Sequence, residues 1–73
     1  MHLGNLKKGQ TATISAIDTS DRAVQHLMVL GLVEGTQLEF AGAAFGGDPL
    51  EFRFNGIALS LRREQARKFQ VTP

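Results

Sequence analysis

The sequence predicts a mainly β fold with one inserted α-helix, closed into a small barrel of about five strands. Five short segments alternate apolar and polar residues with period two, which is typical of half-buried strands. One further segment, residues 20–30, spaces its apolar residues at helical intervals. In a chain of only 73 residues, closure into a barrel is the arrangement that removes exposed sheet edges.

The first predicted strand covers residues 10–17, where small or apolar residues alternate with hydroxyl-bearing ones. The pattern places Ala12, Ile14 and Ala16 on the buried face. Gly9 indicates a turn before the strand, and Leu6 is the first residue expected in the core.

The helix is predicted for residues 20–30. Residues 18–21 are all good N-cap residues, and the pattern does not decide which of them caps. The apolar stripe consists of Ala23, Val24, Leu27, Met28 and Leu30. Gly31 stands where a left-handed C′ residue is needed, which makes Leu27 and Leu32 the hydrophobic pair of a Schellman closure.

The remaining elements follow from alternation and turn residues. A turn at Gly35 leads to a strand over residues 36–42, with Leu38 and Phe40 facing inward. Turn-forming residues then fill positions 42–49. Asn55-Gly56 separates two further alternating runs and predicts a hairpin. These runs begin at Leu50 and Ile57, and they are followed by a helical turn over residues 63–67 and a short strand over residues 68–71.

This order of elements favours an SH3-like barrel formed by a single domain, residues 1–73. A hydrophobic content of 42% and a charged content of 21% are ordinary for a globular domain and argue against disorder. The chain has no cysteine, which favours a reducing compartment and excludes thiolate chemistry. No apolar run is long enough to span a membrane. We therefore expect a cytoplasmic domain.

Three motifs, taken in order, resemble those of the ferrous iron transport protein A (FeoA) family. They are Leu27-Met28-Val29-Leu30-Gly31-Leu32-Val33-Glu34-Gly35, Gly47-Asp48-Pro49-Leu50 and Ile57-Ala58-Leu59-Ser60-Leu61-Arg62, the last followed by Ala66, Phe69 and Val71. Glu34 departs from the family pattern, which usually has proline there. The resemblance implies a cytoplasmic accessory protein of bacterial ferrous iron uptake. Its implied partner is the FeoB-type membrane transporter, which carries its own GTP-hydrolysing domain.

A second function stays open, because a similar SH3-like module forms the C-terminal domain of iron- and manganese-dependent repressors. Fold resemblance alone does not distinguish the two roles. The alternative is therefore a metal-responsive regulatory domain, which requires a defined metal site.

The side chains favour neither catalysis nor a specific metal site. The histidines are His2, near the terminus, and His26, in the middle of the predicted helix. No nucleophile lies at a spacing that would pair with either of them. Arg22 precedes His26 by four residues and is a poor neighbour for a metal cation. We expect no enzyme activity, no cofactor and no specific metal ligands, and leave open a weak metal site that joins histidines of different molecules.

A basic face is predicted near the C-terminal end of the chain, at Arg62, Arg63, Arg67 and Lys68. Nucleic acid is not the expected ligand, since the net charge is only +1 and the chain has neither tryptophan nor tyrosine for stacking. A solvated face is the simplest interpretation. The alternatives are that this face docks to an acidic protein or that it binds anionic lipid headgroups.

Protein docking is the function that the residues favour. Phe45 lies in a glycine-rich loop, where a large apolar side chain either covers a barrel end or contacts a partner. Asp48 is expected to accept bonds from amides of its own loop. The predicted partner-binding residues are Phe45, Gly47, Asp48, Pro49 and Leu50 on the loop, and Gln25, His26 and Val29 on the helix. The sequence does not determine an oligomeric state.

Overall fold

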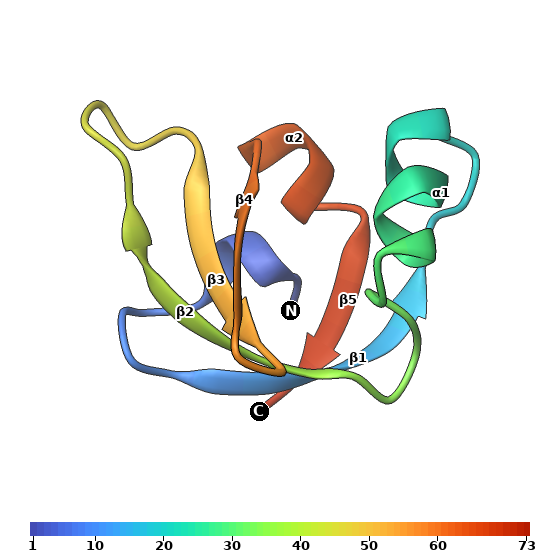
Figure 1. Ribbon diagram of the computed structural model, residues 1–73, viewed down its shortest axis with the longest axis horizontal. Helices are drawn as coiled ribbons and strands as arrows, with labels where there is room; N and C mark the ends of the chain where they lie inside the picture. Colours follow the sequence, from blue (N-terminus) through green and yellow to red (C-terminus); the bar gives the residue numbers. More distant parts are fainter.

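In the computed structural model, which describes residues 1–73, five antiparallel strands form one strongly curved sheet (Figure 1). The strands are β1 (Thr11–Ile17), β2 (Gln37–Ala43), β3 (Leu50–Phe54), β4 (Ile57–Leu61) and β5 (Phe69–Thr72). The helices are the 3-10 turn η1 (Leu3–Asn5), α1 (Arg22–Val29) and α2 (Arg63–Ala66). The predicted mainly β fold with one inserted helix is confirmed. Neither α-helix has the length and apolarity that crossing a bilayer requires.

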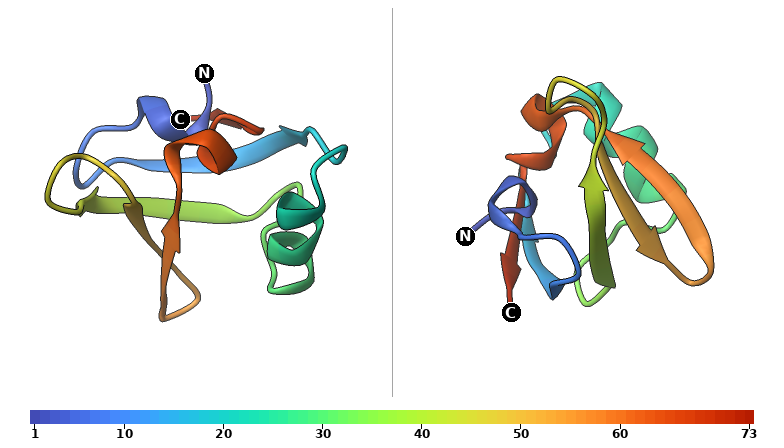
Figure 2. Two further views of the ribbon diagram at one scale, coloured as in Figure 1. Left: turned by 90° about the horizontal axis from the view of Figure 1, so that it is seen from above. Right: turned by 90° about the vertical axis from the view of Figure 1, so that its left-hand side faces the viewer.

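The strand order is β4-β3-β2-β1-β5, so the two edge strands do not pair with each other. Figure 2 shows β4 and β5 at opposite ends of the curved sheet. The expectation that closure leaves no exposed edge is therefore wrong in this respect. Helix α2, rather than ladder hydrogen bonds, connects the two edge strands (Figure 1).

Strand β1 departs from strict alternation at its end. Ala12 and Ile14 are buried as predicted, whereas Ala16 is exposed and Ile17 packs against the core instead. The register between β1 and β5 shifts between Ile14 and Ala16. An extra residue at such a bulge reverses which side chains face inward. The prediction of Ala16 as a core residue is wrong for this reason.

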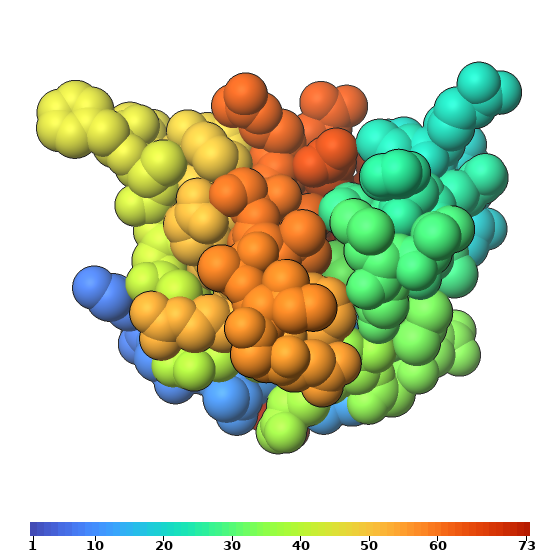
Figure 3. Space-filling model, viewed as in Figure 1, coloured from blue at the N-terminus to red at the C-terminus, as the bar shows by residue number.

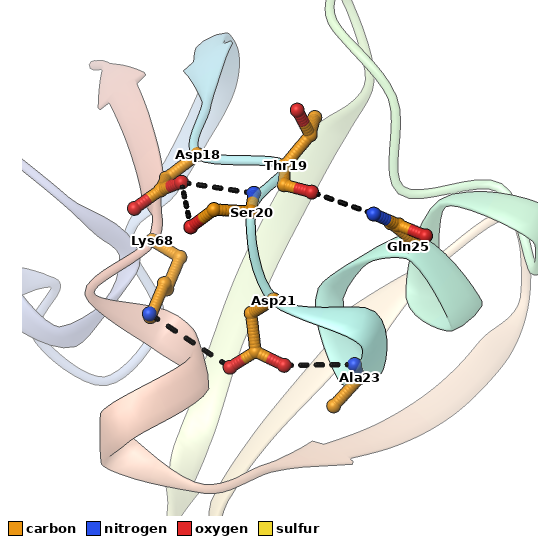
Figure 4. Close-up of polar contacts among 7 residues, drawn as sticks. All are labelled: Asp18, Thr19, Ser20, Asp21, Ala23, Gln25 and Lys68. Carbon is orange, nitrogen blue, oxygen red and sulfur yellow. Dashed lines mark hydrogen bonds and ion pairs between the residues drawn. The ribbon is translucent and has the colours of Figure 1, made fainter.

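Helix α1 begins and ends at local signals. Its N-cap is Asp21, whose carboxylate accepts the Ala23 N–H at 2.8 Å (Figure 4). At its other end the Gly31 N–H donates to Met28 and the Leu32 N–H to Leu27, which is the predicted Schellman pattern. Leu32 is fully buried, but Leu30 is half exposed because the helix stops at Val29.

The core lies inside the curve of the sheet and consists only of apolar side chains. Every phenylalanine except Phe45 belongs to it, and the rings of Phe40 and Phe52 pack with centroids 5.4 Å apart. The other buried residues are Leu3, Leu6, Ala12, Ile14, Val24, Leu27, Leu32, Leu38, Leu50, Leu61, Ala66 and Val71. Ile57 alternates with the core positions of β4 and yet remains 52% exposed, because it begins an edge strand at the tip of a hairpin.

Candidate functional site

The loop between β2 and β3 carries the most exposed apolar side chain of the chain. Phe45 is 106% exposed, and Figure 3 shows the loop extending from the body of the molecule at upper left. Gly46 and Gly47 both have φ near +90°, a conformation that other residues adopt only with strain. The Gly47 N–H donates to the Ala44 carbonyl at 2.8 Å, and this turn directs Phe45 outward. The structure therefore decides between the two predicted positions of Phe45, in favour of exposure.

Residues at the start of helix α2 contact this loop. The Arg63 guanidinium donates from Nε to the Gly47 carbonyl oxygen, 2.6 Å away. The Arg63 backbone N–H donates to Asp48 Oδ1 at 3.0 Å. Asp48 Oδ2 lies 3.9 Å from the guanidinium of Arg62. The predicted role of Asp48 is thus wrong in its partners, because the carboxylate satisfies an amide at the start of α2 and not one in its own loop.

Arg62 and Arg63, which contact this loop, belong to the predicted basic face. The structure divides that face into two parts. Arg62 and Arg63 contact the loop, whereas the Lys68 ammonium lies 3.8 Å from Asp21 Oδ2 at the start of α1 (Figure 4). Arg67 is exposed and lines a shallow surface pocket together with Asp18 and Lys68. The predicted loop and the predicted basic face are therefore joined through Arg62 and Arg63.

Two other loop residues, half-buried Pro49 and buried Leu50, support the base of the loop. Leu50 is 1% exposed at the start of β3, so it packs beneath the loop and is not available to a partner. Its assignment as a partner-binding residue is wrong. The Pro49 carbonyl accepts the Ala44 N–H at 2.9 Å, and this bond closes the base of the loop.

The predicted helical surface lies on the other side of the molecule from the loop (Figure 3). Val29 is 83% exposed, and Gln25 donates from Nε2 to the Thr19 carbonyl at 2.7 Å (Figure 4). His26 lines a groove between α1 and β4. The loop and the helix thus form two separate candidate surfaces.

The segment before α1 contains a carboxyl group, that of Asp18, whose hydrogen bonds change its pKa. The Ser20 hydroxyl donates to Asp18 Oδ1 at 2.7 Å, and the Ser20 N–H donates to the same oxygen at 3.0 Å (Figure 4). These bonds stabilise the carboxylate, with a smaller contribution from the charge of Lys68, and they lower the pKa of Asp18 below its ordinary value. Asp18 is exposed and lies in a turn, so we assign it a structural role.

Side chains of the types that can ligate metals do not cluster in this structure. No group of three or more histidine, aspartate or glutamate residues lies together. His2 accepts the Gly4 N–H at Nδ1, 3.1 Å away, and caps η1.

Sequence reasoning missed the exposed apolar residues where α1 and the β3–β4 hairpin meet. Leu30 is 50% exposed and Ile57 is 52% exposed. The helix pattern of Leu30 and the strand pattern of Ile57 predict core positions for both. Their exposure depends on where each element ends relative to the sheet, which the local pattern does not show.

Comparison with solved structures identifies the fold and a relative. FeoA protein from Chlorobium tepidum is 37% identical, with a TM-score of 0.88 over 97% of this chain and 68% of that one. FeoA from Stenotrophomonas maltophilia, crystallised with zinc and described as a prokaryotic SH3 domain protein, is 24% identical. Its TM-score is 0.86 over 99% of this chain and 89% of that one, which confirms the predicted SH3-like fold.

A manganese-dependent transcriptional repressor in complex with manganese shares the fold at 16% identity and a TM-score of 0.87. The alignment covers 99% of this chain but only 35% of the repressor. No curated protein matches the sequence. The model of the FeoA domain family matches residues 1–73, the whole sequence. With the geometry above and the relative from C. tepidum, this match shows that the chain belongs to the FeoA family.

Proposed function

We propose that this protein is a cytoplasmic accessory protein of ferrous iron uptake, which regulates a FeoB-type membrane transporter by direct contact and without catalysis. Membership of the FeoA family supports the connection to ferrous iron transport. The observation that carries the contact mechanism is the complete exposure of Phe45 on a loop held at fixed points.

An aromatic side chain on such a loop has the properties of a binding hot spot. It offers a large apolar area, and few rotatable bonds must be fixed when it enters a pocket. The bonds from Arg63 to Gly47 and Asp48 fix the loop beforehand, so that less conformational entropy is lost on binding. Arg62 and Arg63 beside the loop supply positive charge for an acidic rim on the partner.

The experiment is an NMR titration of the isotope-labelled protein with the purified cytoplasmic region of its transporter. We expect saturable amide shifts at residues 44–49 and around Arg62 and Arg63. Phe45→Ser should weaken binding about 30-fold, the effect of losing a hot-spot residue worth about 2 kcal/mol. Val29→Ser is the matched control, since Val29 is also exposed but lies on the other surface.

Two results would reject the proposal. One is equal binding by wild type and Phe45→Ser. The other is absence of shifts at high transporter concentration together with stoichiometric binding of Fe²⁺ or Mn²⁺ that His26→Ala abolishes. That second result would favour the metal-responsive regulator, the role suggested by the fold shared with the manganese-dependent repressor.

A further inference from the structure

Strand β4 is the open edge of the sheet. At the opposite edge, the N-terminal segment pairs with β5 through a bridge between His2 and Gln70, and the Val71 N–H donates to the Met1 carbonyl at 2.9 Å. Strand β4 pairs with β3 alone. None of the backbone hydrogen bonds outside the helices and ladders involves residues 57–61.

The hairpin register shows which backbone groups of β4 are free. Asn55 and Gly56 have φ values of +51° and +74°, as in a two-residue primed turn. Such a turn is closed by a hydrogen-bonded pair, here Phe54 and Ile57, and bonded and non-bonded pairs then alternate along the ladder. The N–H and C=O groups of Ala58 and Ser60 therefore point away from β3.

This edge lacks the features that usually prevent strand addition. Its sequence, Ile-Ala-Leu-Ser-Leu, contains no charged residue and no proline. The β3–β4 register has no shift, whereas β1–β5 and β2–β3 each contain one. Proteins normally protect an exposed edge with charges, prolines or bulges, or by covering it with a helix or loop. Helix α1 lies beside β4 but makes no backbone hydrogen bond with it. An unprotected edge is ready to pair with another strand.

Helix α1 runs alongside this edge in the opposite direction (Figures 1 and 3). Near the start of the helix, Arg22 and His26 line a groove together with Ser60 and Gln65. Near its end, the Gly31 backbone approaches the Phe54 ring, so closely that an added Cβ would lie 3.2 Å from it. The groove is thus lined by a cation, Arg22. The exposed apolar residues Leu30 and Ile57 lie outside it, as neighbours of Gly31 along the chain and of Phe54 across the hairpin.

We infer that β4 accepts an extended segment of a partner protein as an additional antiparallel strand. The segment carries carboxylates where it passes Arg22 and apolar side chains where it passes Ile57. Charge complementarity favours this occupant, because Arg22 and His26 line the groove and the neighbouring Glu51 carboxylate is engaged by the Ser60 hydroxyl at 2.8 Å. A proline-rich ligand is disfavoured, since the aromatic-lined groove that such ligands need is not offered by a chain without tryptophan or tyrosine.

This surface lies apart from the Phe45 loop, so the inference does not depend on the proposed contact with the transporter. The probe is a blocked synthetic peptide of about ten residues, the length of a typical added strand. It alternates valine and threonine and has two glutamates at its N-terminal end. A second peptide carries lysines in place of the glutamates.

Binding is measured by NMR, with amide hydrogen exchange as a second readout. We expect the acidic peptide to slow exchange at Ala58 and Ser60 and to give cross-peaks with these residues. Ala58→Pro removes an outward N–H without touching the bonds to β3, so it should weaken binding at least about tenfold. Ala58→Thr is the matched control and should bind normally. Arg22→Glu should reverse the preference between the acidic and basic peptides.

The outcomes separate this inference from its alternatives. Unchanged exchange at Ala58 and Ser60 with saturating peptide overturns it, as does unchanged charge preference in Arg22→Glu. Slow amide exchange at these two residues without peptide, if it depends on protein concentration, also overturns the inference. The occupant of the edge is then a second copy of this chain. Phe45→Ser should bind the peptide like wild type, so failure of the transporter proposal leaves this result unaffected.

Discussion

Replacing Gly31 with alanine should destabilise the protein more than the same change at any glycine whose surroundings are open. Gly31 has a φ of +121°, and a Cβ placed there would lie 3.2 Å from Phe54 Cε2. The residue ends α1 and brings the helix against the β3–β4 hairpin. The substitution therefore tests both the Schellman closure and the contact that aligns α1 with β4.

Two costs contribute to the effect. A non-glycine residue in this region of backbone space costs about 1–3 kcal/mol. Displacing the Phe54 ring in a packed core costs about 1 kcal/mol more. The expected loss of about 2–4 kcal/mol is large beside the roughly 4–11 kcal/mol typical of the total stability of a chain of this size.

Urea unfolding followed by circular dichroism measures the loss. With a slope of about 1 kcal/mol per M, the midpoint should fall by roughly 2–4 M. Gly35→Ala is the control, because Gly35 has a φ of +90° and no atom within 4 Å of the added Cβ. The double variant Gly31→Ala/Phe54→Leu should recover part of the loss, since leucine lacks the ring atom that the Cβ meets.

Two results would refute this reasoning. A cost for Gly31→Ala no greater than that for Gly35→Ala would show that the Phe54 contact contributes nothing. Strict additivity of Gly31→Ala and Phe54→Leu would lead to the same conclusion.

Two further predictions concern the start of α1. Asp21→Ala should lower stability by about 1 kcal/mol in urea unfolding, because it removes the cap bond to the Ala23 N–H; Thr19→Ala is the control, and an equal loss there would contradict the assignment of the cap. Asp18 has a lowered pKa in the folded protein, so its contribution is complete above its ordinary range of about 4 and disappears as pH falls through the lowered value. The stability difference between wild type and Asp18→Asn should therefore shrink on acidification, and a difference that stays constant between about pH 6 and pH 2.5 would contradict this linkage.

The elements predicted correctly from the sequence are those whose signals and partners lie close together along the chain. The closure of α1 joins Leu27, Gly31 and Leu32, and the hairpin turn joins Phe54 to Ile57 across two residues. Local backbone preferences are sufficient for such motifs, because the interacting groups are brought together by a few dihedral angles.

The candidate site was predicted only in part, for the opposite reason. The Phe45 loop is held in place by Arg63, whose backbone N–H donates to Asp48, 15 residues away in sequence. The sequence indicated an unusual loop and a separate basic face, but it did not show that Arg62 and Arg63 of that face contact the loop. Nor did it show that Leu50 lies beneath that surface in the core.

The class of fold, the family motifs and the inward side of most strands can be predicted from the sequence, because alternation and turn chemistry are local properties. The bulge that turns Ala16 outward, and the strand order that leaves one edge of β4 without a neighbour, appear only in the folded molecule. Both depend on how strands distant in sequence align. That alignment is set by the packing of the whole core and not by the residues of any one strand.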